Sequence, residues 1–340
     1  MVQTDECILN CKMEWTIKKL KLELKYTWKI SRNSSEYKEN LIVSCGNFGE
    51  IGLGEVAPNI RYGETPENLL EEFGVIEKDL RDCPTELAEF ETWLNGFKLH
   101  NALRFGIESA FIHWYIGRHK ISLYSLLGID EPKLVSTCYT LPIMDVGDIA
   151  KFYETHKLSR FNYLKVKVSN EEAIDLVKEI TRFNKHKIMI DANEAWKDVD
   201  SLLNFIPKLK PYPIEFIEQP MPAEMEDAYA YLKGKSNICI MGDESVLNQP
   251  NFDKLERQFD GVNMKLMKAG GYLNGVRILR EAKARGMKTM IGCMVESTLG
   301  IKSAWSLCCL AEYADLDGCL IVGNEPFGLL KEENGQFIAN

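Results

Sequence analysis

The sequence lacks several features that would assign it to a common class of protein. No run of 18 apolar residues occurs in its 340 residues, so no membrane-spanning helix is predicted. The acidic start at residues 1–6 is not followed by an apolar segment, and we therefore expect no signal peptide and a cytoplasmic location. Basic residues number 41 against 50 acidic ones, which argues against nucleic acid as a partner.

Paired cysteines and nucleotide-binding loops are missing as well. The ten cysteines form no Cys-x-x-Cys pair, so neither a zinc site nor a redox dithiol is predicted. We expect the cysteines to be small apolar packing residues of a protein in a reducing compartment. No Gly-x-Gly-x-x-Gly turn is present to indicate a dinucleotide site. With 45% hydrophobic and 27% charged residues, the composition is that of an ordinary globular protein. The length suggests two domains or one enlarged barrel.

The first third of the chain changes from a strand pattern to a helix pattern. Alternating apolar residues at 16–22 and 40–45 predict strands of a β-meander, separated by a polar segment at 32–35. From Pro66 to Leu127 the apolar spacing becomes helical. We therefore predict an α+β capping domain over residues 1–127.

Short apolar runs alternate with amphipathic helices after Pro132. From the second run onward they recur roughly every 25 residues, the size of one βα unit. The eight candidate strands end near Leu141, Lys167, Asp191, Glu218, Asp243, Lys265, Cys293 and Leu320. Eight strands are typical of a closed (β/α)8-type barrel, which we predict over residues 128–322, with residues 323–340 returning to the cap. The alternative is an open doubly wound sheet.

Two lysines stand at the end of the second candidate strand. Side chains alternate along a strand, so Lys165 and Lys167 lie on one face. Two ammonium groups crowded in a partly dry barrel mouth are expected to lower each other's pKa, and such a lysine can act as a base near neutral pH. On its own, a Lys-x-Lys tripeptide is more often part of a solvated edge strand.

Three neighbouring strands end in acids, namely Asp191, Glu218 and Asp243. Active sites of barrel enzymes lie at the carboxyl ends of the strands, so these three side chains are expected on one rim. Taken singly, each acid is more often a helix cap or a salt-bridge partner. Taken together, their mutual repulsion favours a bound divalent cation, and oxygen-only ligands favour magnesium or manganese.

Lys265 ends the sixth strand, which lies half the barrel circumference from the second. Lys167 and Lys265 should therefore face each other across the mouth. A substrate carboxylate held near the three acids would place its α-carbon between two amines. One amine would remove the α-proton, and the other would return a proton to the opposite face of the resulting enediolate. The pattern predicts an epimerase or racemase.

Five motifs occur in the order Lys-x-Lys, Asp-x-Asn, Glu-Gln-Pro, Asp-Glu-Ser and Lys-x-x-Lys-x-Gly-Gly. In this order they resemble the enolase superfamily, and within it the muconate-lactonizing-enzyme subgroup. The segment Gly52–Pro58 also looks like the Gly-x-Gly-Glu-x-x-Pro cap segment of that family. The resemblance implies an α/β fold, a TIM-like modified (β/α)7β barrel with an N-terminal α+β capping domain.

The resemblance also implies roles for individual residues. It implies Lys167 and Lys265 as the two bases, with Lys165 as an electrostatic helper of Lys167. One Mg²⁺ per subunit, with Mn²⁺ as a possible substitute, is implied at Asp191, Glu218 and Asp243. Substrate contacts are expected from Thr140 and Lys268, and support of the metal ligands from Asn193 and Glu244.

Two further patterns distinguish between branches of the family. Mandelate-racemase and sugar-acid-dehydratase relatives carry a histidine on the seventh strand, whereas all five histidines here precede the fourth strand, which excludes those branches. Asp315 and Asp317 resemble the Asp-x-Asp of dipeptide epimerases, whose two acids hold the free α-ammonium group of the substrate. Elsewhere, a lone Asp-x-Asp is usually only a loop. The segment 291–297 also looks like the seventh strand of that group.

The cap loops are expected to select the substrate side chain. Arg32 in the first loop and Arg61 in the second could each bind a carboxylate through the guanidinium fork, although both could also be exposed surface cations. In Ala-Glu epimerases an arginine of the first loop binds the glutamate side chain, and Arg32 lies within a residue of the matching place. We therefore predict an isomerase, a magnesium-dependent L-Ala-D/L-Glu epimerase for peptidoglycan-derived dipeptides.

Three alternatives remain. A dipeptide epimerase with another side-chain preference fits the same motifs, because only the loop arginines point to glutamate. An o-succinylbenzoate synthase would use the same lysines and metal for dehydration, but its substrate has no ammonium group for Asp315 and Asp317. A non-catalytic binding barrel is disfavoured because every expected polar position is filled. A homo-oligomer is possible, since the family often forms symmetric assemblies.

Overall fold

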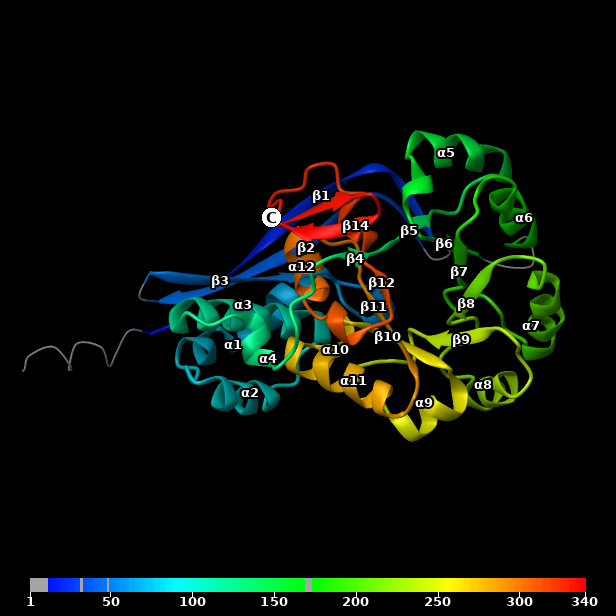
Figure 1. The fold of residues 1–340 in the computed structure, drawn as a ribbon. Coiled ribbons are helices and arrows are strands. Elements are labelled where there is room, and N and C mark those ends of the chain that lie inside the picture. Colours follow the sequence, from blue (N-terminus) through cyan, green and yellow to red (C-terminus); the bar gives the residue numbers. More distant parts are fainter. Residues whose placement is uncertain (1–11, 31–32, 48, 169–172) are drawn as a thin grey trace, which may run out of the picture.

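The computed structural model describes residues 12–30, 33–47, 49–168 and 173–340, and its elements form an N-terminal group and a barrel (Figure 1). The N-terminal group begins with an antiparallel sheet in the order β1-β2-β3. Its strands are β1 (Glu14–Ile30), β2 (Asn33–Asn47) and β3 (Glu50–Val56). Four helices follow: α1 (Pro66–Arg81), α2 (Leu87–Asn95), α3 (Asn101–His119) and α4 (Leu123–Leu127). The predicted α+β order is confirmed.

A parallel sheet of eight strands, in unbroken chain order from β5 to β12, forms the barrel. Its strands are β5 (Cys138–Leu141), β6 (Tyr163–Lys167), β7 (Lys187–Asp191), β8 (Ile214–Glu218), β9 (Cys239–Gly242), β10 (Gly261–Lys265), β11 (Lys288–Gly292) and β12 (Tyr313–Asp315). The helices after the strands are α5 (Ile149–Thr155), α6 (Ala173–Phe183), α7 (Val199–Phe205), α8 (Glu226–Lys233), α9 (Phe252–Gln258), α10 (Leu266–Ala269), α11 (Tyr272–Ala284) and α12 (Thr298–Trp305). The predicted α/β barrel is confirmed.

The barrel is nearly closed between its first and last strands. Next to β5, the hydroxyl of Thr137 accepts a hydrogen bond from the Leu316 N–H (2.9 Å), just after β12. The prediction that the eighth strand ends near Leu320 is wrong. The strand stops at Asp315, and a 3-10 helix (Asp317–Cys319) follows, in which the Leu320 N–H bonds back to the Asp317 carbonyl. Asp317 therefore lies just beyond the strand end.

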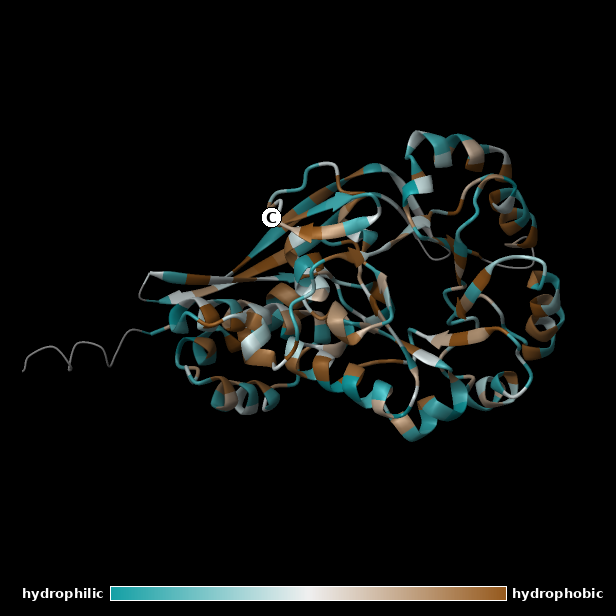
Figure 2. Cartoon of the chain, viewed as in Figure 1, coloured by the Kyte–Doolittle hydropathy of each residue, from teal (hydrophilic) through white to brown (hydrophobic). Residues whose placement is uncertain are grey.

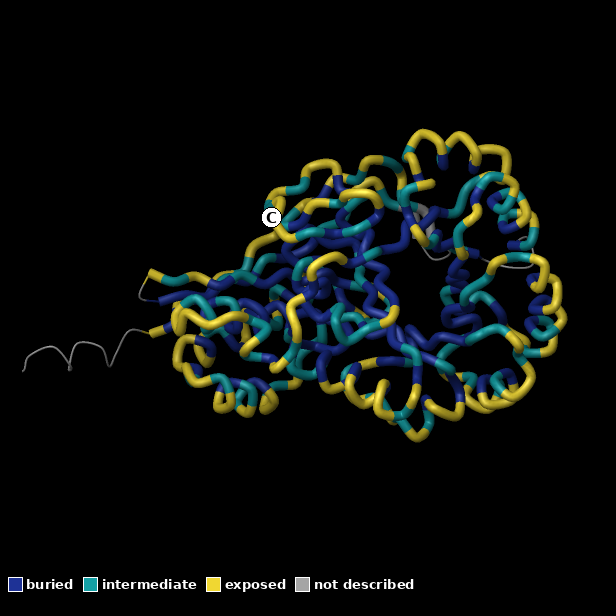
Figure 3. Tube along the Cα trace, in the orientation of Figure 1, coloured by how far each residue is buried: buried dark blue, intermediate teal, exposed yellow. Residues whose placement is uncertain are grey.

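Apolar side chains fill the barrel below its mouth. Because residues alternate between the two faces of a strand, six strands each contribute one inward side chain to a single cluster. The cluster comprises Cys138, Met189, Phe216, Met241, Met290 and Tyr313. Hydrophobic residues likewise face inward on the surrounding helices, and the exposed residues lie on the outer surface (Figures 2 and 3). The barrel is therefore a packed core and not a pore, and the candidate site residues lie at its carboxyl end.

The β1–β2 hairpin reaches from the cap to the barrel mouth. The Tyr26 hydroxyl lies 2.9 Å from that of Tyr139 on β5, and the Gly323 N–H donates to the Glu23 carbonyl (2.7 Å). A second antiparallel sheet joins β13 (Leu330–Glu333) and β14 (Gln336–Ala339) to β4 (Val135–Ser136). The chain end thus lies beside the start of the barrel, while the domain bounds stay a prediction.

The eight described cysteines are all free, and Cys45, Cys83, Cys138 and Cys319 are buried. These four fit the prediction of apolar packing residues. In the part of the chain that the structure describes, no helix is both long and apolar enough to cross a bilayer.

Close packing of β3 on α3 explains a glycine of the cap segment. A Cβ atom at Gly54 would lie 2.1 Å from the Gly106 carbonyl oxygen and 2.4 Å from Ser109 Oγ. Both atoms belong to α3, and the buried Ser109 hydroxyl already donates to the Phe105 carbonyl. Only a residue without a side chain allows the strand and the helix to approach this closely.

We expect Gly54→Ala to lower the free energy of unfolding by about 3 kcal/mol, because the added methyl group overpacks this contact. Gly74→Ala is the matched control, since a Cβ at Gly74 in α1 meets nothing within 4 Å. Alanine is the better helix former by about 0.5–1 kcal/mol, so the control should be slightly stabilised. Urea denaturation measures both; equal stabilities would contradict the packing argument.

Candidate active site

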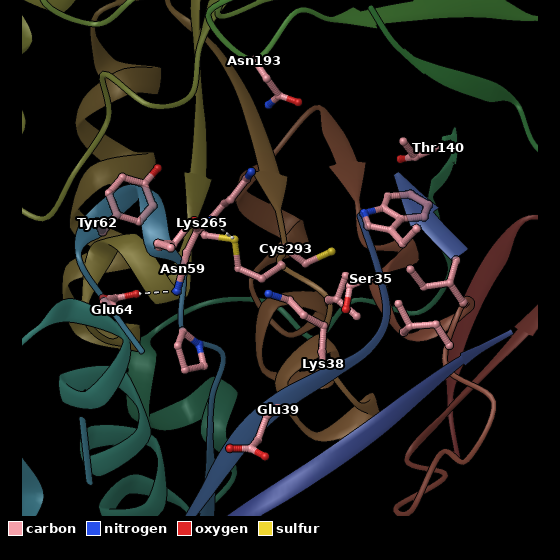
Figure 4. A pocket seen from close by; sticks show the side chains of 18 of the residues that line it. Ser35, Lys38, Glu39, Asn59, Tyr62, Glu64, Thr140, Asn193, Lys265 and Cys293 are labelled. Carbon is pink, nitrogen blue, oxygen red and sulfur yellow. Dashed lines mark hydrogen bonds between the residues drawn. The ribbon is translucent and has the colours of Figure 1, made fainter. Parts of the chain in front are cut away.

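A cavity of about 590 Å³ lies between the cap and the carboxyl ends of the barrel strands. Thr140, Asn193, Lys265 and Cys293 enter it from the barrel, whereas Ser35, Lys38, Asn59 and Tyr62 enter it from the cap (Figure 4). The cap half includes a loop that Glu64 fixes by accepting the Asn59 N–H (3.1 Å). The cavity is thus built from residues far apart in the sequence.

Lys165 lies at the centre of the acidic cluster. Its Nζ is 2.7 Å from a carboxylate oxygen of Glu218 and 2.6 Å from one of Asp315. A third carboxylate, that of Asp191, is 3.0 Å away. The Lys165 side chain is only 3% exposed, so these contacts form in a largely dry environment. The structure brings the second strand's inner lysine together with acids of the third, fourth and eighth strands.

The two lysines predicted as bases lie on strands four places apart, β6 and β10, as expected. Lys167 Nζ is 2.8 Å from Asp191 Oδ2 and donates to Asn193 Oδ1 (2.8 Å). Lys265 Nζ is 2.9 Å from Asp243 Oδ2. Space beside Lys265 depends on Gly292, where a Cβ would lie 2.9 Å from Lys265 Cε.

The lysine pKa values differ from the sequence-based prediction. Burial alone would lower the pKa of Lys165, but the surrounding carboxylates raise it well above its ordinary value. Burial is also the largest single effect at Lys265 and would lower its pKa, but the neighbouring acidic groups, Asp243 foremost and then Glu218, together raise the pKa well above the ordinary value. The prediction that lysine crowding lowers the Lys165 pKa is therefore wrong, because ion pairs with acids dominate.

The acids at the strand ends are all fully or almost fully buried. At Asp191, burial would raise the pKa, but Lys165 and Lys167 hold it well below its ordinary range. At Glu218, burial prevails and raises the pKa to about 7. Glu218 therefore lies close to the balance between its ionised and neutral forms, whereas Asp191 is held in the ionised form. Additional positive charge nearby would favour the ionised form of Glu218.

The donor chemistry of Asp191, Glu218 and Asp243 suits a hard divalent cation, because all three offer carboxylate oxygens. Register places Asp191 directly opposite Glu218 on the adjoining strand, and Asp243 follows the next strand by one residue. Among the described residues, however, no three potential ligands are gathered as they would be around a metal ion. Lys165 instead lies between Asp191 and Glu218.

Neighbouring side chains fix the orientation of these acids. The Asn263 amide donates to Glu218 Oε1 (2.7 Å) from β10. Lys268 is 1% exposed and donates to the carboxylate and the carbonyl of Asp243, and it is absent from the lining of the described cavity. The structure thus places Lys268 beside Asp243, whereas the sequence suggested a substrate contact. Glu244 lies against Asn193 (3.4 Å).

Unusual backbone conformations occur beside the acids. Asn193, Glu194 and Gln219 have φ values of 42°, 66° and 36°, in the left-handed region. Such conformations cost energy for residues with side chains and cluster at functional sites. The side-chain amide oxygen of Gln219 accepts the Asp243 N–H (2.8 Å), which ties the ends of β8 and β9 together.

The Asp-x-Asp pair has two different environments. Asp315 is held by Lys165 and also accepts a hydrogen bond from Cys138. Asp317 accepts the Thr140 N–H but forms no ion pair with any residue that the structure describes. Burial, and then the nearby charge of Asp315, raise the Asp317 pKa to about 7. A cationic ligand group at this end of the cavity would complement Asp317.

Comparison with known proteins identifies the family. A family model described as "Enolase C-terminal domain-like" matches residues 148–321. The chain belongs to the enolase superfamily. It is 30% identical over 315 residues to the L-Ala-D/L-amino acid epimerase of Maribacter sp., with 91% of each chain covered, and 28% identical over 330 residues to the L-Ala-D/L-Glu epimerase of Bacteroides thetaiotaomicron, with 97% and 86% covered.

Solved structures of the superfamily agree with the fold. The dipeptide epimerase of Enterococcus faecalis, complexed with Mg and the dipeptide L-Leu-L-Tyr, is 26% identical to this chain. The match has a TM-score of 0.86 and covers 97% of this chain and 98% of that one. The suggested relationship to dipeptide epimerases is thereby confirmed.

Of the two cap arginines predicted to bind the substrate, only Arg61 is described by the structure, and it does not line the cavity. Arg61 forms a two-point contact with Glu194 (2.9 and 3.0 Å) and also reaches Glu224 (3.2 Å). Its guanidinium joins the cap to the barrel, and it is absent from the described cavity lining. Arg32 lies outside the described residues.

Several cavity residues of the cap were missed by the sequence reasoning. The cavity is lined by Lys38 on β2, by Asn59 at the N-cap of the 3-10 helix η1 (Ile60–Tyr62) and by Tyr62 at the end of that helix. No motif distinguishes them, because their position depends on how the cap docks. The alternation of β2 could have placed Lys38 on one face of the strand but could not have shown that this face meets the barrel.

Proposed function

We propose that this protein is a magnesium-dependent dipeptide epimerase acting on L-Ala-D/L-Glu, which inverts the α-carbon of the C-terminal residue. The observation that carries the proposal is the pair Lys167 and Lys265, on opposite strands of one barrel mouth and each in contact with a buried acid. A substrate between them would present opposite faces of its α-carbon to two amines. Proton removal on one face and proton return on the other inverts the centre.

The proposed chemistry is a 1,1-proton transfer. One lysine in its neutral form takes the α-proton, which leaves an enediolate, and the ammonium of the other lysine donates a proton to the opposite face. A divalent cation held by Asp191, Glu218 and Asp243 would supply positive charge for the developing negative charge of the substrate carboxylate. Lys165, among the same acids, would add to this charge and would not transfer a proton.

The other end of the substrate is proposed to lie at Asp317. This acid is buried, and among the residues that the structure describes its carboxylate is hydrogen-bonded only to Thr140, so a free α-ammonium group would give it the missing positive partner. The substrate of an o-succinylbenzoate synthase has no such group. Asp317 therefore favours an epimerase of peptides with a free N-terminus over the lyase.

Deuterium exchange tests the proposal. The protein, supplied with MgCl2, is incubated in D2O with a library of L-Ala-L-X dipeptides, and exchange is read by mass spectrometry and chiral chromatography. We expect incorporation of one deuterium and formation of the L,D isomer, most rapidly for L-Ala-L-Glu. Absence of exchange with every dipeptide would contradict the assignment. Exchange with other dipeptides only would favour an epimerase with another side-chain preference.

Removal of the substrate ammonium is expected to mimic removal of Asp317. N-Acetyl-L-Ala-L-Glu should have a kcat/KM about 10-fold to 100-fold lower than L-Ala-L-Glu in the wild-type protein, because Asp317 loses a charged partner. In Asp317→Asn, the free dipeptide should lose a similar factor, and acetylation should cost little more. If acetylation lowered kcat/KM by the same factor in Asp317→Asn as in the wild-type protein, the substrate ammonium would not be bound by Asp317.

A further inference from the structure

The inference concerns Lys38 and rests on the proposed function. Lys38 lies on β2 opposite Leu22 on β1, and it shares its strand face with Asn40, two residues along. Asn40 donates to the Val295 carbonyl (2.9 Å), beyond the end of β11, and Leu22 packs in a cluster with Val295 and Ile321. This face of the cap sheet is therefore the one that covers the barrel mouth.

The Lys38 side chain enters the cavity from this face. It is half-buried, and its amine points from β2 toward the side where Cys293 and Lys265 lie (Figure 4). The amine thus reaches the interior from the cap, opposite the barrel residues that are proposed to hold the reacting carbon. A substrate bound between the lysines would extend its side chain toward the cap.

Lys38 differs from the other lysines of the cavity wall. Four of them contact a carboxylate, and these are Lys19, Lys165, Lys167 and Lys265. Lys38 makes no hydrogen bond or ion pair with any described residue, and the neighbouring acid Glu39 is instead paired with Lys19 (2.5 Å). Burial without a partner lowers the pKa of Lys38. An ammonium group in this position is complemented by an anion supplied by the ligand.

We propose that Lys38 is a specificity residue that binds the side-chain carboxylate of an acidic residue at the C-terminal position of the dipeptide. In the proposed function, the acids at the strand ends hold the cation that binds the α-carboxylate, and Lys167 and Lys265 act on the α-carbon. The partner of Lys38 must therefore be a second anionic group of the substrate. A glutamate side chain provides that group, and a neutral side chain leaves Lys38 without a counter-charge. Lys38 is thus a cationic side chain, among the described residues, that could bind the side chain of an acidic substrate.

The test compares L-Ala-L-Glu with L-Ala-L-Gln, which has nearly the same shape and no side-chain charge. In Lys38→Met, kcat/KM for L-Ala-L-Glu should fall about 10-fold to 100-fold, as expected for loss of a charge-assisted hydrogen bond. The value for L-Ala-L-Gln should change by no more than about 3-fold. Lys38→Arg should keep the preference for glutamate. Lys18→Met, at an exposed position of β1, is the matched control and should leave both values unchanged.

The outcomes separate the inference from the proposed function. Equal losses for both dipeptides in Lys38→Met, or no loss for either, would overturn the role of Lys38 while leaving the epimerase intact. A wild-type protein that turns over no dipeptide would overturn both. Thermal denaturation of each variant shows whether it is folded, and if Lys38→Met is not, Lys38→Gln gives the same comparison. A wild-type preference for L-Ala-L-Gln over L-Ala-L-Glu would also overturn the inference.

Discussion

Alanine at Lys167 or at Lys265 is expected to reduce the rate of epimerisation by at least about 1,000-fold, because each variant lacks one of the two groups that move a proton. The remaining lysine can still exchange the α-proton of the isomer that faces it. We expect Lys167→Ala to lose exchange with L-Ala-L-Glu and to retain it with L-Ala-D-Glu, and Lys265→Ala to show the opposite pattern. Mass spectrometry of each isomer after incubation in D2O measures this.

The two lysine variants are expected to exchange the α-proton of opposite isomers, and this difference between them is what the experiment tests. Lys254→Ala serves as the control, since its side chain forms a surface ion pair with Glu226 on the outside of the barrel. It should epimerise both isomers at the wild-type rate. Loss of exchange with the same isomer in both lysine variants would show that the two amines act on one face. Full epimerisation in either variant would exclude that lysine as a base.

Removal of the divalent cation is expected to have an effect of similar size. Treatment with EDTA should abolish both exchange and epimerisation, and added MgCl2 should restore them. Glu218→Gln should weaken Mg²⁺ binding by about 100-fold or more, measured by isothermal titration calorimetry, because Glu218 is a fully buried carboxylate at the centre of the proposed ligand set. Turnover at saturating magnesium should fall along with affinity.

A control for Glu218 is available on the same strand. Glu215 lies three residues earlier on β8, where Lys187 and the Tyr313 hydroxyl contact it at the other end of the strand. Glu215→Gln should leave Mg²⁺ affinity unchanged. Activity that survives exhaustive chelation, or equal Mg²⁺ affinities in the two variants, would show that Glu218 does not hold the cation.

The polar residues at the barrel mouth were predictable because short sequence motifs place them at the ends of the strands. Lys165 and Lys167 alternate on one strand, and an acid ends each of the next two strands, so local pattern and parallel topology together bring them to one rim. The direction of the pKa shift of Lys165 was not predictable in the same way. Lysine–lysine repulsion suggested a lowered pKa, whereas the structure surrounds Lys165 with three acids from three other strands.

The sequence by itself determined the barrel, its order of strands and the set of polar residues at its mouth, because each depends on periodicity and on motifs of a few residues. Only the tertiary structure decided which cap residues reach that mouth. Arg61 is drawn to Glu194, far along the chain, while Lys38 is carried into the cavity by the face that the β1–β2 hairpin presents to the barrel. Docking of two groups of elements depends on long-range packing, and no local pattern of residues encodes it.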